Sequence, residues 1–100
     1  DGVFAVDVSI DEGAGEKVYQ GVANVGVRPT LEEESLKPIL EVFLFDFDGD
    51  LYGSCVKVVF CSKLRNEKKF DGLEELKQAI AADVTQAKLF FVERNKRSAL

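Results

Sequence analysis

The amino-acid sequence predicts one α+β domain that is mainly β: a small antiparallel β-barrel with one C-terminal amphipathic helix. Three observations support this fold class. The 100 residues suffice for one hydrophobic core but not for two domains, so residues 1–100 are taken as a single domain. The first two thirds contain alternating or continuous apolar runs, and the last third has apolar residues at helical spacing. Strands followed by one helix are typical of α+β domains.

The first two predicted strands form a hairpin. Val3–Ile10 places apolar side chains on one face and Asp7 on the other, which predicts a strand with one wet side. Lys17–Val27 resumes as a β-rich segment after a polar turn that contains glycine. Gly21 and Gly26 interrupt this strand, where a bulge or a tight barrel bend is favoured over contact with a ligand.

The third and fourth predicted strands, Ile39–Phe47 and Leu51–Cys61, form a second hairpin around the turn DFDGD. Cys55 and Cys61 would lie roughly 20 Å apart along one strand, so they are predicted to be free, buried thiols. Closed barrels usually need about five strands or more, so further strands are expected before the first residue.

A single helix is predicted after a charged loop over residues 62–70. Asp71 and Glu74 resemble a capping box at its start. Apolar residues then recur at steps of three and four over about twenty residues: Leu73, Leu76, Ile80, Val84, Ala87 and Phe91.

Composition excludes several classes of function. The net charge of −5 and a pI near 4.7 argue against nucleic acid or an anionic membrane as partner. No apolar run approaches about 18 residues and no leader is recognisable, so a cytoplasmic protein without a membrane span is expected. From the absence of histidine we expect no zinc site, no histidine general base and no Ser-His-Asp triad.

The aspartate-rich segment has three interpretations. Residues 46–51, DFDGDL, resemble the D-x-D-G-T-L signature of haloacid-dehalogenase phosphatases, but Asp50 replaces the threonine and the chain is short for that fold. An EF-hand calcium loop would need glycine and glutamate where Leu51 and Lys57 stand. A turn, in which Asp and Gly supply local hydrogen bonds and positive φ, is favoured.

Three segments taken together, GVANVGVRPT, LEVFLFDFDGDLYG and KLRNEKKFDGLEELKQAIAADV, resemble the riboflavin kinase domain. The likeness is to the C-terminal module of the bacterial bifunctional riboflavin kinase/FAD synthetase, and it runs from Gly2 to about Ala87. It implies a barrel of the riboflavin kinase type and phosphorylation of riboflavin to FMN by ATP with Mg²⁺, leaving ADP. It also implies that an FAD synthetase (adenylyltransferase) domain can be fused to such a module.

The resemblance assigns Glu41 as the catalytic base that accepts the proton of the ribityl hydroxyl as this oxygen attacks the γ-phosphate of ATP. The parity of the strand places Glu41 on an apolar side with Phe43, where burial would raise the carboxylate pKa above its usual value of about 4.3. Phe43 itself stands where relatives are expected to carry histidine.

The remaining site residues are also implied by similarity. Contacts to the nucleotide are assigned to Leu44, Asp46 and Tyr52, and contacts to the flavin to Arg65, Lys68 and Phe70 in a closing loop. A solvated charged loop is the alternative for the two cations, and Asn24 and Arg28 are expected to be mainly structural.

The family's magnesium and phosphate segment, G-x-P-T-A-N, is expected before Asp1, so the domain is predicted to be truncated, with no metal ligand inside this chain. A non-catalytic barrel module that binds a nucleotide or a protein is the alternative function, which the aligned Glu41 disfavours.

Overall fold

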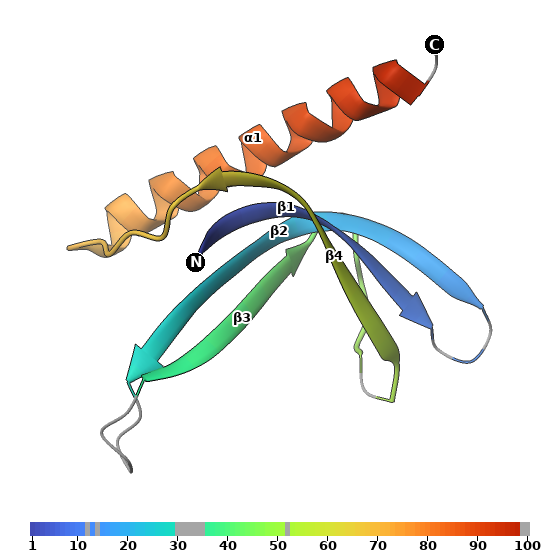
Figure 1. Ribbon diagram of the computed structural model, residues 1–100, viewed down its shortest axis with the longest axis horizontal. Helices are drawn as coiled ribbons and strands as arrows, with labels where there is room; N and C mark the ends of the chain where they lie inside the picture. The colour runs from blue at the N-terminus through green and yellow to red at the C-terminus, as the bar shows by residue number, and fades with distance from the viewer. Residues whose placement is uncertain (12, 14, 30–35, 52, 99–100) are drawn as a thin grey trace.

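The computed structural model describes residues 1–11, 13, 15–29, 36–51 and 53–98. It contains four strands and one helix, which are β1 (Gly2–Asp11), β2 (Glu16–Pro29), β3 (Leu36–Leu44), β4 (Cys55–Arg65) and α1 (Leu73–Ser98). The strands form one antiparallel sheet in the order β3-β2-β1-β4, and α1 lies along the outside of its curve (Figure 1). The predicted mainly β domain with one C-terminal helix is confirmed.

The pairing of β3 and β4 differs from the prediction. The hairpin of β1 and β2 is confirmed, but β3 pairs with β2, and β4 pairs with the far side of β1. This spatial order is that of a Greek key. Only six residues separate β2 from β3, and short connections favour neighbouring strands. The predicted second hairpin is therefore wrong, and the aspartate-rich segment connects the two edges of the sheet.

Several element boundaries also shift. β3 ends at Leu44, because the backbone of Asp46 adopts a left-handed conformation with φ of 57° that cannot continue a strand. β4 runs on to Arg65, so part of the predicted charged loop is strand. The backbone N–H of Leu76 donates to the carbonyl of Gly72, which makes Gly72 the N-cap of α1 in place of Asp71. The helix has 26 residues and is longer than predicted.

β1 is buried on both faces. Its inner face packs in a cluster formed by Val6, Val8, Ile10 and Ala23, with Phe4, Tyr19, Leu44, Phe47 and Val58 around it. Its outer face meets α1 in a second cluster formed by Ala5, Phe45, Ala87 and Phe91, with Val22, Leu64, Val84 and Phe90 around it. The face of β1 that the sequence predicted to be wet is therefore the face that α1 covers.

The sheet is an open curl. In the described part of the chain β3 and β4 are its edges, and no pairing joins them. Leu40 and Val42 on β3, with Val56 and Phe60 on β4, lie opposite inner-face residues in the register and are partly exposed. Four strands are too few to close around such a core. Among the described helices, none is both long and apolar enough to cross a membrane.

Gly21 permits a close approach between β2 and β3. A Cβ at this position would collide with the backbone carbonyl of Phe43, whereas a Cβ at Gly26 would meet only the carboxylate end of the Glu67 side chain. The register of β2 is continuous with both neighbours across Gly21 and with β3 across Gly26, so the described pairing contains no bulge at these positions. A tight barrel bend, the other predicted explanation, stays a prediction. A neighbouring backbone is the reason for glycine at position 21.

We predict that Gly21→Ala lowers the free energy of unfolding by about 1–3 kcal/mol, because the backbone of β3 must shift to admit the methyl group. Gly26→Ala is the matched control and should lower the stability less than Gly21→Ala, since the nearest atoms to its methyl group belong to the end of a side chain and not to a backbone. Urea denaturation measures both. Equal losses for the two variants would contradict the close-approach interpretation.

Candidate functional site

The predicted site residues come from both edges of the sheet. Glu41 on β3 lies opposite Asn24 on β2, Asn24 lies opposite Val3 on β1, and Val3 lies opposite Arg65 on β4. Residues directly opposite one another share a face, so this row runs across the α1 side of the sheet. At the usual strand spacing, Glu41 and Arg65 are roughly 14 Å apart along the sheet. The register therefore aligns the predicted base with the start of the predicted flavin loop.

Glu41 is exposed, so the prediction of a buried carboxylate is wrong. The reason is that β3 is an edge strand, while α1 packs mainly on β1, β2 and β4. Phe43, on the same face, is also exposed. Beside Glu41 in the register, the Oδ1 atom of Asn24 is buried and has no hydrogen-bond partner in the described part of the chain. An accessible carboxylate thus stands next to an amide oxygen.

The predicted nucleotide residues diverge at the end of β3. Leu44 packs with the inner cluster, whereas Asp46 is exposed beyond the end of the strand. Between them, Phe45 is buried in the outer cluster, and its N–H donates to the carbonyl of Gln20 over 2.8 Å. Tyr52 lies outside the described residues, as does the side chain of Arg28.

The three predicted flavin residues lie together after β4. The guanidinium of Arg65 lies 5.6 Å from the centre of the Phe70 ring, and the ammonium of Lys68 lies 5.7 Å from it. Arg65 also donates two hydrogen bonds of 2.8 Å to the carboxylate of Asp83 on α1. Two cations therefore lie near the ring of Phe70, and one of them, Arg65, is hydrogen-bonded to the helix.

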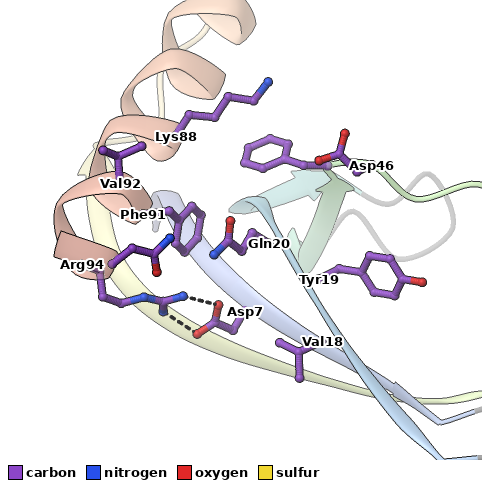
Figure 2. Close-up of a pocket in the computed structure, with 11 residues that line it drawn as sticks. Asp7, Val18, Tyr19, Gln20, Asp46, Lys88, Phe91, Val92 and Arg94 are labelled. Carbon is purple, nitrogen blue, oxygen red and sulfur yellow. Dashed lines mark hydrogen bonds and ion pairs between the residues drawn. The ribbon is translucent and has the colours of Figure 1, made fainter. Parts of the chain in front are cut away.

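A cleft of about 520 Å³ lies between α1 and β2 (Figure 2). Its apolar wall includes Phe45 and Phe91, whose rings meet edge to face at 6.5 Å. The ammonium of Lys88 lies 5.2 Å from the centre of the Phe45 ring. Of the assigned site residues that the structure describes, only Asp46 lines this cleft.

A charged cluster forms part of the lining of the cleft, through Asp7 and Arg94. Arg94 donates two hydrogen bonds to Asp7, of 2.7 and 3.2 Å, and the thiol of Cys61 donates to the same carboxylate over 3.3 Å. The bond from Arg94 lowers the pKa of Asp7 below its usual value, and that of Arg94 is raised in turn. Burial, followed by the neighbouring Asp7, raises the pKa of the Cys61 thiol. Arg65 likewise has its pKa raised by its bond to Asp83.

Two charged residues on the side of α1 that packs on the sheet were not predicted from the sequence. Asp83 follows Ile80 by three residues and precedes Ala87 by four, so it belongs to the apolar face of the helix. Arg94 follows Phe91 by three residues in the same way. A charged residue within an apolar stripe is the signal that could have identified them. Cys55 and Cys61 are free, as predicted, but their predicted burial is wrong, because Cys55 is exposed and Cys61 only partly buried on the edge strand β4.

The described residues do not form a metal site: no three of their Cys, Asp or Glu side chains gather as ligands. Asp46, Asp48 and Asp50 therefore do not build the calcium loop considered from the sequence. The segment after them leads into β4 and not into a helix, which also argues against the phosphatase fold.

Comparison with known proteins identifies relatives for nearly the whole chain. The Flavokinase family model, described as riboflavin kinase, matches residues 1–91. The bifunctional riboflavin kinase/FMN adenylyltransferase of Haemophilus influenzae is 48% identical over 90 residues, which cover 90% of this chain and 28% of that protein. The Escherichia coli K12 protein of the same name is also 48% identical over 90 residues, which cover 90% of this chain and 27% of that protein. The chain thus spans little more than a quarter of these relatives.

A solved structure gives the same picture of the fold. The crystal structure of a protein described as a macrolide-efflux protein from Streptococcus pneumoniae superposes with a TM-score of 0.68 at 35% identity. The match covers 83% of this chain and 25% of that one. The sheet and helix described above are therefore shared with an experimentally determined structure.

We predict that Arg94→Gln lowers the free energy of unfolding by about 1–2 kcal/mol at pH 7, because Asp7 loses its charged partner. The folded-state pKa of Asp7 is depressed, so the stabilisation is present above the unfolded value of about 3.9 and disappears as the pH falls through the folded value. Urea denaturation at pH 7 and at pH 3 should show the difference between the variant and wild type shrinking with acid.

The control is Lys96→Gln, which removes an exposed pair in which the Lys96 ammonium lies 3.6 Å from Glu93. It should change the stability by less than about 0.5 kcal/mol at either pH. A loss for Arg94→Gln that does not depend on pH would contradict the assigned interaction with Asp7.

Proposed function

The chain belongs to the riboflavin kinase family, and we propose that it transfers the γ-phosphate of ATP to the terminal ribityl hydroxyl of riboflavin. The products are FMN and ADP. The family match over residues 1–91 carries this proposal. The alignment of Glu41 with the start of the flavin loop on one face of the sheet supports it.

Glu41 is proposed as the general base. The ribityl oxygen forms a bond to the γ-phosphorus, the bond from this phosphorus to the β,γ-bridging oxygen breaks, and the hydroxyl proton passes to the Glu41 carboxylate. Exposure of Glu41 on an edge strand leaves the carboxylate accessible to a substrate. Phosphoryl transfer depends mostly on positioning and charge stabilisation, so the base supplies only part of the acceleration.

The nucleotide and the flavin are proposed to bind at the residues implied by the family resemblance. Leu44, Asp46 and Tyr52 are assigned to ATP. Lys68 and Phe70 are assigned to the flavin, where the ring offers an apolar surface and the exposed ammonium can attract the phosphate of FMN. Arg65, at the end of β4 where this loop begins, is also assigned to the flavin.

Mg²⁺ enters this proposal as part of the substrate, bound to the phosphates of ATP. The described residues offer no group of three ligands for it, so its protein ligands are proposed to lie outside them. The relatives join this module to an FMN adenylyltransferase, and we propose the same bifunctional context and a cytoplasmic location, where ATP is supplied.

We predict that Glu41→Gln lowers kcat by about 10²–10⁴-fold, because the amide cannot accept the hydroxyl proton. The affinity for FMN, measured by quenching of flavin fluorescence, should change less than about threefold, since the two side chains have nearly the same shape. Glu16→Gln, at the start of β2, is the control and should leave both values unchanged.

Two results would count against these assignments. Near-normal turnover of Glu41→Gln would remove the role as base. A wild-type protein that forms no FMN from riboflavin and ATP with Mg²⁺ would overturn the proposed function itself.

We predict that Phe70→Ala raises the KM for riboflavin by about tenfold, because the flavin loses an aromatic contact surface. The KM for ATP should stay within about twofold, since binding at the nucleotide residues does not involve this ring. Phe60→Ala, which removes an aromatic ring from the inner face of β4, is the matched control and should leave the KM for riboflavin unchanged. Equal effects on both KM values would argue against a flavin-specific role of Phe70.

A further inference from the structure

Asp83 is a buried charged side chain in the middle of α1. The residue is 7% exposed, and its carboxylate accepts hydrogen bonds of 2.8 Å from both Nε and Nη2 of Arg65. A buried carboxylate is costly unless it is paired and hydrogen-bonded, and a two-point pair with a guanidinium also fixes orientation. The pair therefore holds Arg65, the last residue of β4, against the helix in one geometry.

The same guanidinium reaches both ends of the predicted flavin loop. Its Nη1 donates to the carbonyl of Asn66 over 3.1 Å, at the first residue of the loop. Its centre lies 5.6 Å from the ring of Phe70, at the other end of the loop. One cation thus connects α1, the end of β4 and the aromatic ring assigned to the flavin.

The hydrogen bonds that Arg65 donates within the protein leave few of its N–H groups to bind a ligand. The nitrogens Nε, Nη1 and Nη2 each donate to a protein oxygen. The flat edge formed by Nε and Nη2 would otherwise bind a phosphate at two points, and it is occupied by Asp83. The geometry therefore favours a role for Arg65 in holding the loop over a role in binding a phosphate group.

We propose that Asp83 is a positioning residue of the flavin site, which acts through Arg65 to hold Phe70 in place. This inference rests on the proposed riboflavin kinase function. It predicts that Asp83 controls the affinity for riboflavin and contributes little to phosphoryl transfer, because Asp83 belongs to the helix and its two hydrogen bonds are accepted from Arg65.

A second ion pair in the same domain provides a matched control. Arg94 and Asp7 also join α1 to the sheet through two hydrogen bonds, of 2.7 and 3.2 Å. Arg94 lies 4.9 Å from the ring of Phe91, which belongs to the outer cluster and not to the loop. The two pairs share their chemistry, but only that of Asp83 reaches the flavin loop.

The test compares Asp83→Asn with Asp7→Asn in the protein as its natural gene encodes it. Asp83→Asn should raise the KM for riboflavin by about tenfold and leave the KM for ATP within about twofold. Asp7→Asn should lower the stability but leave the KM for riboflavin unchanged. Asp83→Glu should recover part of the affinity, because it restores the charge. Equal effects of the two asparagine variants on the KM for riboflavin would overturn the proposal.

A double-mutant cycle tests whether Asp83 acts through the aromatic ring. In a Phe70→Ala background, Asp83→Asn should cause little further increase in the KM for riboflavin, because there is no ring left to position. If Asp83→Asn raises the KM for riboflavin as much in the Phe70→Ala background as in wild type, the proposal that Asp83 acts through Phe70 is overturned. If Asp83→Asn does not fold, Arg65→Lys replaces it in the double-mutant cycle. Lysine keeps the positive charge but cannot form the two-point pair with Asp83.

Hydrogen exchange keeps this inference separate from the proposed function. Asp83→Asn should increase exchange of the backbone amides at 66–72, and Asp7→Asn should not. If wild type forms no FMN, the function fails, and with it the assignment to a flavin. Hydrogen exchange then decides by itself whether Asp83 orders the loop. If exchange at 66–72 is the same in Asp83→Asn and wild type, the inference is overturned, even when the enzyme is active.

Discussion

The burial of β1 on both faces is the constraint on which the rest of the structure depends. A central strand has to fill two cores, and β1 does so with Val6, Val8 and Ile10 inside the curl and Ala5 toward α1. Ala5 and Ala87 are both fully buried in the outer cluster, so small side chains let the helix lie close to the sheet. Larger residues at either position would lift α1 and separate its charged residues from their partners.

The two ion pairs determine where along the sheet the helix sits. Apolar contacts are not directional, and a stripe with a repeat of three and four residues could slide by a turn at little cost. The pairs of Asp7 with Arg94 and of Arg65 with Asp83 can form in only one register of α1 on β1 and β4. Breaking either leaves a partly buried charge without its partner, which explains why such pairs specify an arrangement even when their net contribution to stability is small.

Local pattern predicted most of the elements, but not how they pair. The strand over Val3–Ile10 and the C-terminal helix depend on residues close in the chain, and both elements are confirmed. Which faces they bury was predicted less well, because α1 covers the face of β1 that was expected to be wet, and Leu73, Leu76 and Ile80 of the predicted stripe are exposed. The partner of a strand depends on the whole topology, so the turn-like composition around Asp48 suggested a hairpin that does not exist. For the same reason the exposure of Glu41 was mispredicted: parity gives its face, but not whether that strand is an edge. Asp83 was missed although it is a charged residue within an apolar stripe, and no family resemblance pointed to it as one did to Glu41.

The curl of the sheet, more than any single residue, determines the distance between the predicted base and the flavin loop. The predicted base is on one edge strand and the flavin loop follows the other, so the bend between them sets their separation. Between Phe60 and Arg65, β4 advances five residues while β1 advances only three, because two register shifts add residues to β4. Such irregularities bend a strand, and Figure 1 shows β4 bending over toward α1. The bend brings Arg65 within hydrogen-bond distance of Asp83. The position of the flavin loop therefore depends both on the irregular pairing of β4 and on this ion pair.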